Sequence, residues 1–221
     1  MKAGAKWILA LPALGAATLA GLIAWSWPLG AYLIDGNRLL KSYYIPSESM
    51  LPTLQVGDRI IPRALEPGDI RSGAVVLFRV AGDVRVTRIA AVAGDRIAVS
   101  NGVLVLNGKP IAQTPAGIGS AGKADPQARR YLDQFPGEAK PHAILDARLT
   151  AADNFPELTV PTGHFFTLGD NRDNSADSRF TREEYGVGMV PVGDAFATVD
   201  FVAWTSRGAR PTPRKIEDLD P

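Results

Sequence analysis

Two serines lie in a short loop that is bounded by prolines. Pro46 and Pro52 restrict the backbone on either side of Ser47 and Ser49. Nucleophilic catalysis needs a hydroxyl held in one place, because a positioned serine turns a rare collision into a near-attack geometry. Serines in proline-flanked turns are also ordinary turn residues, so this loop by itself does not establish catalysis.

A second group of polar residues is the run from Gly169 to Arg179, which reads Gly-Asp-Asn-Arg-Asp-Asn-Ser-Ala-Asp-Ser-Arg. Its aspartates and arginines can pair locally and brace a loop, or they can form a solvated charged turn. A calcium loop of the EF-hand type needs glycine at its sixth position and glutamate at its twelfth. This chain has Ser175 and Thr181 there, so the EF-hand pattern is excluded.

Composition limits the chemistry further. The 221 residues include 24 basic and 23 acidic side chains, two histidines and no cysteine. The absence of cysteine excludes disulfides, thiolate metal sites and cysteine nucleophiles. A net charge of +1 gives no broad positive field, so nucleic acid is not an expected partner. With no paired-histidine motif and no glycine-rich phosphate loop, we expect no metal and no organic cofactor.

Residues 7–27 form an uncharged apolar stretch with Trp7 at one end and Trp25 and Trp27 at the other. A helix of this length is about 30 Å long, which matches a bilayer core, and the tryptophans suit its interfaces. Lys2 and Lys6 favour a cytoplasmic N-terminus over residues 1–6. We therefore expect a single membrane anchor, in preference to a cleaved signal peptide or a buried core helix.

The rest of the chain has the pattern of short strands. Apolar and β-branched runs are separated by glycine turns, and Asn101-Gly102 predicts a tight hairpin. The predicted architecture is mainly β, with a linker over 28–42, a β-rich domain over 43–205 and a loose tail over 206–221. Residues 107–157 are expected to be irregular, with one strand at 143–149. The other predicted strands are 58–62, 74–80, 84–93, 96–99, 103–106, 164–168 and 195–204.

Four stretches together resemble bacterial signal peptidase I, the membrane-anchored serine endopeptidase that removes signal peptides. They are 46–54 (PSESMLPTL), 57–59 (GDR), 88–95 (RIAAVAGD) and 169–179 (GDNRDNSADSR). The resemblance covers most of the chain from residue 43 to about 204. It implies an antiparallel β-sheet catalytic domain of signal peptidase type behind one N-terminal transmembrane helix. The long run at 169–179 is closer to the general signal peptidase branch than to the specialised peptidases of conjugation systems.

The resemblance also implies roles for individual residues. Ser49, directly before Met50, matches the nucleophile of the family. Ser47 matches a serine whose hydroxyl helps the Ser49 backbone N–H to form an oxyanion hole. Ser175 matches the serine that orients the general base, and a supporting ion pair is implied for Asp177 and Arg179.

The substrate of such an enzyme is an exported pre-protein that binds as an added extended strand. Small residues near its cleavage site occupy shallow apolar pockets, and we expect Ile45, Met50, Leu54 and Val86 to line them or else only to pack. The implied location is the bacterial cytoplasmic membrane, with the lipid bilayer as a partner and the catalytic domain outside.

One position departs from the family pattern. The family's general base is a lysine eight residues before the aspartate of the Gly-Asp pair, and this chain has Thr87 there. A lysine can serve because burial lowers its pKa from about 10.4, whereas threonine has no basic atom. Arg85 and Arg88 lie close by, but a guanidinium stays protonated and cannot act as a base.

Other bases are conceivable but lie outside the motif positions. His164 precedes the run at 169–179 and has suitable chemistry, while His142 lies in the stretch expected to be irregular; Lys41 and Lys109 are the nearest lysines. Three accounts therefore stay open. The chain is a signal peptidase that hydrolyses poorly, a peptidase with a different base, or a non-catalytic paralogue that binds signal peptides or a partner protein.

Overall fold

The computed structural model describes residues 34–35, 38–39, 41–123, 125–205 and 214–216. The chain divides into two units, Met1–Lys41 and Ser42–Pro221. In the first unit, β1 (Ile34–Asp35) and β2 (Arg38–Leu39) form an antiparallel pair. The expected anchor at 7–27 lies outside the described residues. Within the described ranges, no helix has the length and apolar character needed to cross a membrane.

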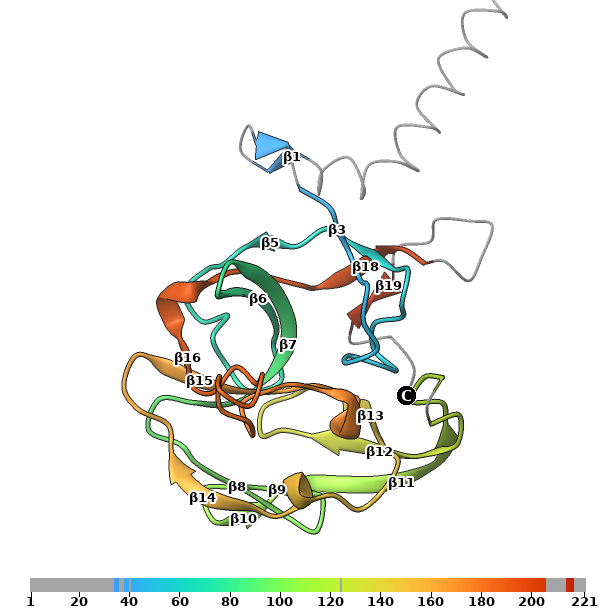
Figure 1. Cartoon of the computed structure of the whole chain (residues 1–221). Helices are drawn as coiled ribbons and strands as arrows, with labels where there is room; N and C mark the ends of the chain where they lie inside the picture. Colours follow the sequence, from blue (N-terminus) through green and yellow to red (C-terminus); the bar gives the residue numbers. More distant parts are fainter. Residues whose placement is uncertain (1–33, 36–37, 40, 124, 206–213, 217–221) are drawn as a thin grey trace, which may run out of the picture. The chain divides into compact units, whose positions relative to one another are not determined.

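The second unit is built from antiparallel sheets and short 3-10 helices, and no α-helix occurs in its described residues (Figure 1). This confirms the predicted mainly β architecture. Its central six-stranded sheet has the order β16-β15-β7-β6-β17-β5. The strands are β5 (Arg63–Ala64), β6 (Val75–Val80), β7 (Asp83–Val92), β15 (His164–Leu168), β16 (Val190–Pro191) and β17 (Ala195–Thr198).

Three smaller sheets complete this unit. The first, in the order β19-β18-β4-β3, contains β3 (Tyr43–Tyr44), β4 (Arg59–Ile60), β18 (Phe201–Trp204) and β19 (Arg214–Lys215). The second, β10-β9-β8-β14, contains β8 (Arg96–Ser100), β9 (Val103–Leu106), β10 (Lys109–Pro110) and β14 (Phe155–Thr159). The third, β11-β12-β13, contains β11 (Ala112–Gly119), β12 (Ala128–Gln134) and β13 (His142–Asp146). The 3-10 helices are η1 (Ala151–Asp153), η2 (Arg172–Asn174) and η3 (Val192–Asp194).

The hairpin predicted at Asn101-Gly102 is present. Ser100 and Val103 face each other across β8 and β9, and both loop residues have positive φ, 49° for Asn101 and 79° for Gly102. A two-residue loop of this kind needs left-handed backbone at both positions, which asparagine and glycine accept most readily.

Residues 107–157 differ from the irregular structure that the sequence predicted. They contain four strands, β10 to β13, together with η1 and the start of β14. Of these, β13 (His142–Asp146) overlaps the one strand expected there, at 143–149. β11 is Ala-Gln-Thr-Pro-Ala-Gly-Ile-Gly with no side chain fully buried, and β12 alternates poorly because it carries Arg129, Arg130 and Asp133. Their regularity comes from backbone pairing between β11, β12 and β13. Apolar periodicity cannot detect strands that depend so little on apolar side chains.

Two boundaries near the C-terminus also differ. The single strand expected over 195–204 is broken into β17 and β18. The tail expected to be loose contributes β19, which pairs with β18, and the Ile216 backbone N–H donates to the Asp200 carbonyl at 2.8 Å. Ile216 packs against the apolar cluster around Val202 and Ile60, which explains why this part of the tail is held. The remainder of 206–221 lies outside the described residues.

The core beneath the central sheet is aromatic. Phe78 of β6 and Phe165 of β15 are fully buried, with ring centroids 5.9 Å apart in an edge-to-face arrangement. They pack in one cluster with Val76, Ile89 and Val190. This cluster joins the strands from which the candidate site is built.

We predict that Phe165→Ala lowers the free energy of unfolding by about 3–5 kcal/mol, because it leaves a cavity that the rigid sheet cannot fill. The control is Ile118→Ala, at a side chain that is 66% exposed, which should change it by less than about 0.5 kcal/mol. Denaturant unfolding of both variants measures the difference. A cost for Phe165→Ala as small as that of the control would contradict the packing described here.

Candidate active site

The two serine hydroxyls of the proline-flanked loop lie side by side. Ser47 Oγ and Ser49 Oγ are 3.1 Å apart, with Ser47 exposed and Ser49 half-buried. After Ser49 the chain turns tightly, and the Leu54 N–H donates to the Met50 carbonyl at 2.8 Å. The loop is therefore ordered by its own backbone bonds as well as by its prolines.

Asn171 fastens this loop to the rest of the domain. Its backbone N–H donates to the Ser49 carbonyl at 3.1 Å. Its side-chain amide donates to the carbonyls of Glu48 and Ala121, both at 2.9 Å. Asn171 is fully buried, so no water competes for these bonds. It thus holds the carbonyls of both peptides that flank Ser49, one before it and one after it.

Gly169 allows the run at 169–179 to approach the serine loop. A side chain at Gly169 would place its Cβ 2.2 Å from Ser175 Oγ and 2.6 Å from the Ser49 carbonyl oxygen. Only a residue without a Cβ fits between these two serines. Ser175 is itself buried, and it lines the same cavity as Ser49.

The ion pair expected between Asp177 and Arg179 is present. Arg179 Nη2 lies 2.9 Å from Asp177 Oδ2 and Arg179 Nε lies 2.9 Å from Oδ1, while the Gly169 N–H donates to Oδ2 at 3.1 Å. Arg179 also donates to the carbonyl of Arg172. Both side chains are buried, so the pair braces the backbone on which Ser175 sits.

A second buried ion pair joins β7 to the residue after Gly169. Arg88 donates to both carboxylate oxygens of Asp170, at 2.8 Å and 2.7 Å, and to the Gly73 carbonyl at 2.8 Å. Thr53 donates its hydroxyl to the same carboxylate. Three segments that are far apart in sequence therefore meet at one carboxylate, and one of them carries Ser49.

The electrostatics of this pair favour its charged form. Burial alone would raise the pKa of Asp170, but the charge of Arg88 and its two hydrogen bonds outweigh burial and lower the pKa below its ordinary value. Asp170 raises the pKa of Arg88 in return, against the effect of burial. The pair stays ionised throughout the physiological pH range.

Thr87 points away from this pair and into the cavity that holds Ser49. The cavity has a volume of about 750 Å³ and is lined by Ser47, Ser49, Ser175 and Thr87 among others. Thr87 is 5% exposed, and its hydroxyl oxygen is buried without a hydrogen-bond partner among the described residues. Alternation along β7 thus separates the structural Arg88 from the cavity-lining Thr87.

The predicted pocket residues divide into two pairs. Ile45 and Val86 line the cavity. Met50 and Leu54 are fully buried in an apolar cluster with Ile60 and are not among the lining residues, so they take the alternative role of packing.

The cavity lining, drawn from the described part of the chain, contains no lysine and no histidine. His142 Nδ1 faces Glu138 at 3.2 Å and its ring stacks on Phe135. His164 Nδ1 lies 3.1 Å from the Thr162 carbonyl, and Lys109 lies on β10. Arg85 does line the cavity, but it cannot accept a proton.

One wall of the cavity is an open sheet edge. Residues 83–87 of β7 pair with β6 on one side. On the other side β15 pairs only with Arg88 and later residues of β7, and no other described strand takes the vacant position. An unpaired edge of this kind can accept an extended peptide through backbone hydrogen bonds.

Sequence reasoning missed Asn171, Thr53 and the Arg88–Asp170 pair as parts of the site. These residues lie inside the recognised motifs, but nothing in their spacing says which side chains meet. Only the approach of β7 to the segment after β15 reveals the pairing.

Comparisons with known proteins agree on one family. The family model described as "Signal peptidase, peptidase S26" matches residues 19–204. Signal peptidase I of Bacillus caldolyticus is 31% identical over 189 residues, covering 81% of this chain and 89% of that protein. Signal peptidase I of Pseudomonas fluorescens is 31% identical over 210 residues, covering 78% and 68%. A signal peptidase I structure from Enterococcus faecalis V583 shares 21% identity, covers 62% of this chain and 98% of its own, and has a TM-score of 0.36.

We predict that Asp170→Asn lowers the free energy of unfolding by about 3–5 kcal/mol at pH 7, because it leaves buried Arg88 with only the more distant carboxylate of Glu138, 3.9 Å away. The control is Glu157→Gln in the exposed pair with Arg96, whose atoms are 3.4 Å apart, which should cost no more than about 1 kcal/mol. Because the pKa of Asp170 is lower in the folded state, its contribution to the free energy of unfolding is complete above the unfolded-state pKa of about 3.9. That contribution is lost as pH falls through the folded-state pKa. The difference between wild type and Asp170→Asn in denaturant unfolding should therefore shrink below about pH 4, and a constant difference would contradict this.

Proposed function

The chain belongs to the signal peptidase family, peptidase S26, and we propose that it is a signal peptidase I-type serine endopeptidase acting on the signal peptides of exported pre-proteins, with slow hydrolysis because Thr87 occupies the position of the family's lysine. The observation that carries the proposal is the cavity in which the Ser49 hydroxyl, 3.1 Å from that of Ser47, shares one space with Ser175 and Thr87. The site would act at the outer face of the bacterial cytoplasmic membrane, where such substrates arrive.

Substrate binding would use the open edge of β7. An extended peptide laid along residues 83–87 passes the mouth of the cavity that Ser49 and Ser47 line. Ile45 and Val86 would receive its small apolar side chains. Backbone hydrogen bonds to a strand edge tolerate many sequences, which suits a protease that acts on many pre-proteins.

The chemical step would begin with attack of Ser49 Oγ on the carbonyl carbon of the scissile peptide bond. The Ser47 hydroxyl and the Ser49 backbone N–H would stabilise the negative charge that develops on the carbonyl oxygen. Asn171 supports this role, because its side-chain amide donates to the Glu48 carbonyl, which lies in the same peptide plane as the Ser49 N–H. The Ser49 proton must leave during the attack, and the described lining of this cavity offers no amine or imidazole to accept it.

The lack of a lysine or histidine in the described cavity lining also favours a second function. The threonine at the base position, in a cavity whose described lining has no lysine or histidine, would suit a protein that binds signal peptides without cutting them. The binding surface of β7 and the cavity walls do not depend on a base. The two functions differ only in whether bound peptide is turned over.

We predict that Thr87→Lys raises the rate of signal-peptide cleavage by about 10²- to 10⁴-fold, because it supplies the missing general base. Burial should lower the pKa of the new lysine, so the rate should increase with pH as its amine loses a proton. The matched control is Thr87→Arg, which has similar length and charge but cannot act as a base. Equal rates for wild type and Thr87→Lys, both abolished by Ser49→Ala, would show that another group serves Ser49.

We also predict that Ser49→Ala binds a fluorescent signal peptide with a Kd within about twofold of wild type, because it removes the nucleophile but leaves the strand edge intact. Fluorescence anisotropy measures the affinity, and mass spectrometry of the same mixture measures cleavage. Cleavage by wild type that disappears in Ser49→Ala supports the peptidase. Equal binding by both proteins with no product from either supports the binding protein, and loss of binding in Ser49→Ala contradicts both.

A further inference from the structure

The Thr87 hydroxyl is buried in the wall of the cavity that holds Ser49, and it has no partner. Thr87 is 5% exposed, and its Oγ1 makes no hydrogen bond to any described residue. Buried polar atoms in native proteins are normally satisfied, and a hydroxyl can both donate and accept a hydrogen bond. The orphaned hydroxyl therefore points to a polar ligand in the cavity.

The cavity has room for such a ligand next to the proposed nucleophile. Its volume is about 750 Å³, and Thr87 lines it together with Ser49 and Ser175. Ser175 is buried as well, so it offers a second hydroxyl in a site with little access to water. A small molecule beside Thr87 would share this space with the Ser49 oxygen.

Part of the cavity wall is apolar. Four aliphatic side chains contribute to its lining, namely Ile45, Ile60, Leu77 and Val86. Apolar surface of this kind favours a ligand that carries a short hydrocarbon chain over one that is polar throughout.

The charged part of the wall favours a cation over an anion. The described lining contains the acidic residues Asp83, Asp173 and Glu184, and its only basic residue is Arg85. Arg85 is directed in part to Asp83, with Nη2 and Oδ2 3.9 Å apart. A cavity lined mainly by one sign of charge attracts the opposite sign.

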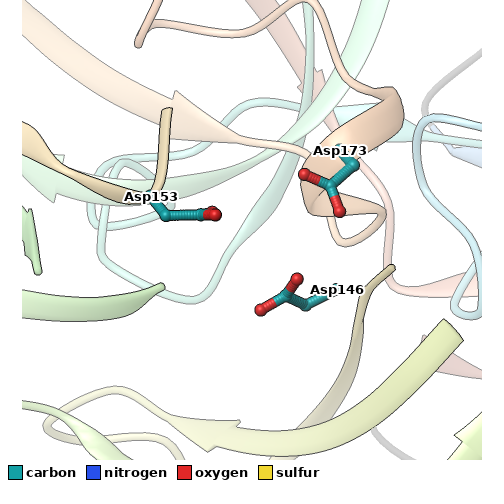
Figure 2. Close-up of side chains that lie close together, drawn as sticks. All are labelled: Asp146, Asp153 and Asp173. Atoms are coloured by element: carbon teal, nitrogen blue, oxygen red, sulfur yellow. The ribbon is translucent and has the colours of Figure 1, made fainter. Parts of the chain in front are cut away.

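Asp173 connects this wall to further negative charge. Its Oδ2 accepts hydrogen bonds from the backbone N–H groups of Ala147 and Arg148, while its Oδ1 has no hydrogen-bond partner among the described residues. Figure 2 shows its carboxylate close to those of Asp146 and Asp153. One oxygen of each lies within 4.8 Å of those of the other two. The acidic character of this wall thus extends behind the cavity.

We propose that the cavity binds a small primary alkylamine beside Thr87, and that this amine accepts the Ser49 proton. The nitrogen of a neutral amine accepts one hydrogen bond and donates two, so it can satisfy the Thr87 hydroxyl. Its hydrocarbon chain suits the apolar wall, and the carboxylates favour the ammonium ion that forms when it takes a proton. The inference rests on the proposed function, since it supplies a base that the described lining lacks.

The proton transfers in the proposed reaction balance. As Ser49 Oγ bonds to the scissile carbonyl carbon, its proton passes to the amine nitrogen and the carbonyl oxygen takes the negative charge. When the carbon–nitrogen bond breaks, the ammonium ion gives that proton to the departing nitrogen and the carbonyl re-forms. Water then hydrolyses the acyl-enzyme, with the same amine accepting a proton from the water and returning it to Ser49 Oγ.

The experiment measures cleavage of a signal-peptide substrate by the full-length chain at increasing ethylamine concentration and constant ionic strength. We expect the rate to rise about 10- to 100-fold and to saturate, because a bound base supplies part of the usual effect of general-base catalysis. The amine-dependent rate should increase about tenfold per pH unit below the ordinary alkylamine pKa, which is close to the value of about 10.4 for lysine. Ser49→Ala should give no product at any ethylamine concentration.

Two variants test the place of binding. Thr87→Val keeps the shape of the side chain but removes the hydroxyl, so half-saturation should need several-fold more ethylamine. Thr87→Arg fills the space beside the strand and should abolish the response. Tetramethylammonium is the matched ligand control, because it carries the same charge but cannot accept a proton.

The variant Thr87→Lys distinguishes failure of this inference from failure of the proposed function. If Thr87→Lys cleaves the substrate and wild type does not respond to ethylamine, the amine site is wrong and the peptidase stands. If neither Thr87→Lys nor wild type with ethylamine forms product, both are wrong. An equal rise with tetramethylammonium, or an unsaturated rise that Thr87→Arg shares, would overturn the amine site, because it would reflect ions or base in bulk solution.

Discussion

The Arg88–Asp170 ion pair is the interaction on which the rest of the site depends. It lies among buried groups, where a charged side chain has no water to replace a lost partner, so neither residue can move without the other. Thr53 binds the same carboxylate. The irregular loop that carries Ser49 is thereby fixed to the central sheet only four residues beyond the serine.

The same constraint explains how the fold accommodates a threonine at position 87. Successive residues of a strand face opposite sides, so Arg88 points to the ion pair while Thr87 points to the cavity. A change at Thr87 leaves Arg88, Asp170 and the packing of β6 against β15 untouched. β-branched threonine is also a favourable strand residue. Arg88 therefore serves the structure, whereas its neighbour Thr87 occupies the position that bears on hydrolysis.

The sheet of β11, β12 and β13 supports the site through contacts of β13 with the segment after Gly169. Asp146 and His142 at the ends of β13 face different polar groups, and the Leu145 N–H donates to the Asp170 carbonyl at 2.8 Å. β13, which lies in the stretch 107–157 that was predicted to be mostly irregular, is thus in direct contact with the motif at 169–179. Carboxylates from three segments meet there because β13 runs beside the residues after Gly169.

Strand pattern and turn chemistry were enough to predict a mainly β domain and the hairpin at Asn101-Gly102, because both depend on neighbours in the chain. The resemblance to the signal peptidase motifs implied the antiparallel sheet and the pairing of Asp177 with Arg179. The same resemblance predicted that Ser47, Ser49, Ser175 and Thr87 belong to one site, and in the structure all four line one cavity. Three outcomes depend on the three-dimensional fold: Met50 and Leu54 pack in the core, 112–119 and 128–134 form strands, and Arg88 meets Asp170 and Thr53. Those outcomes depend on contacts between residues distant in sequence, and neither residue type nor spacing specifies which distant partner a side chain or a strand edge will find.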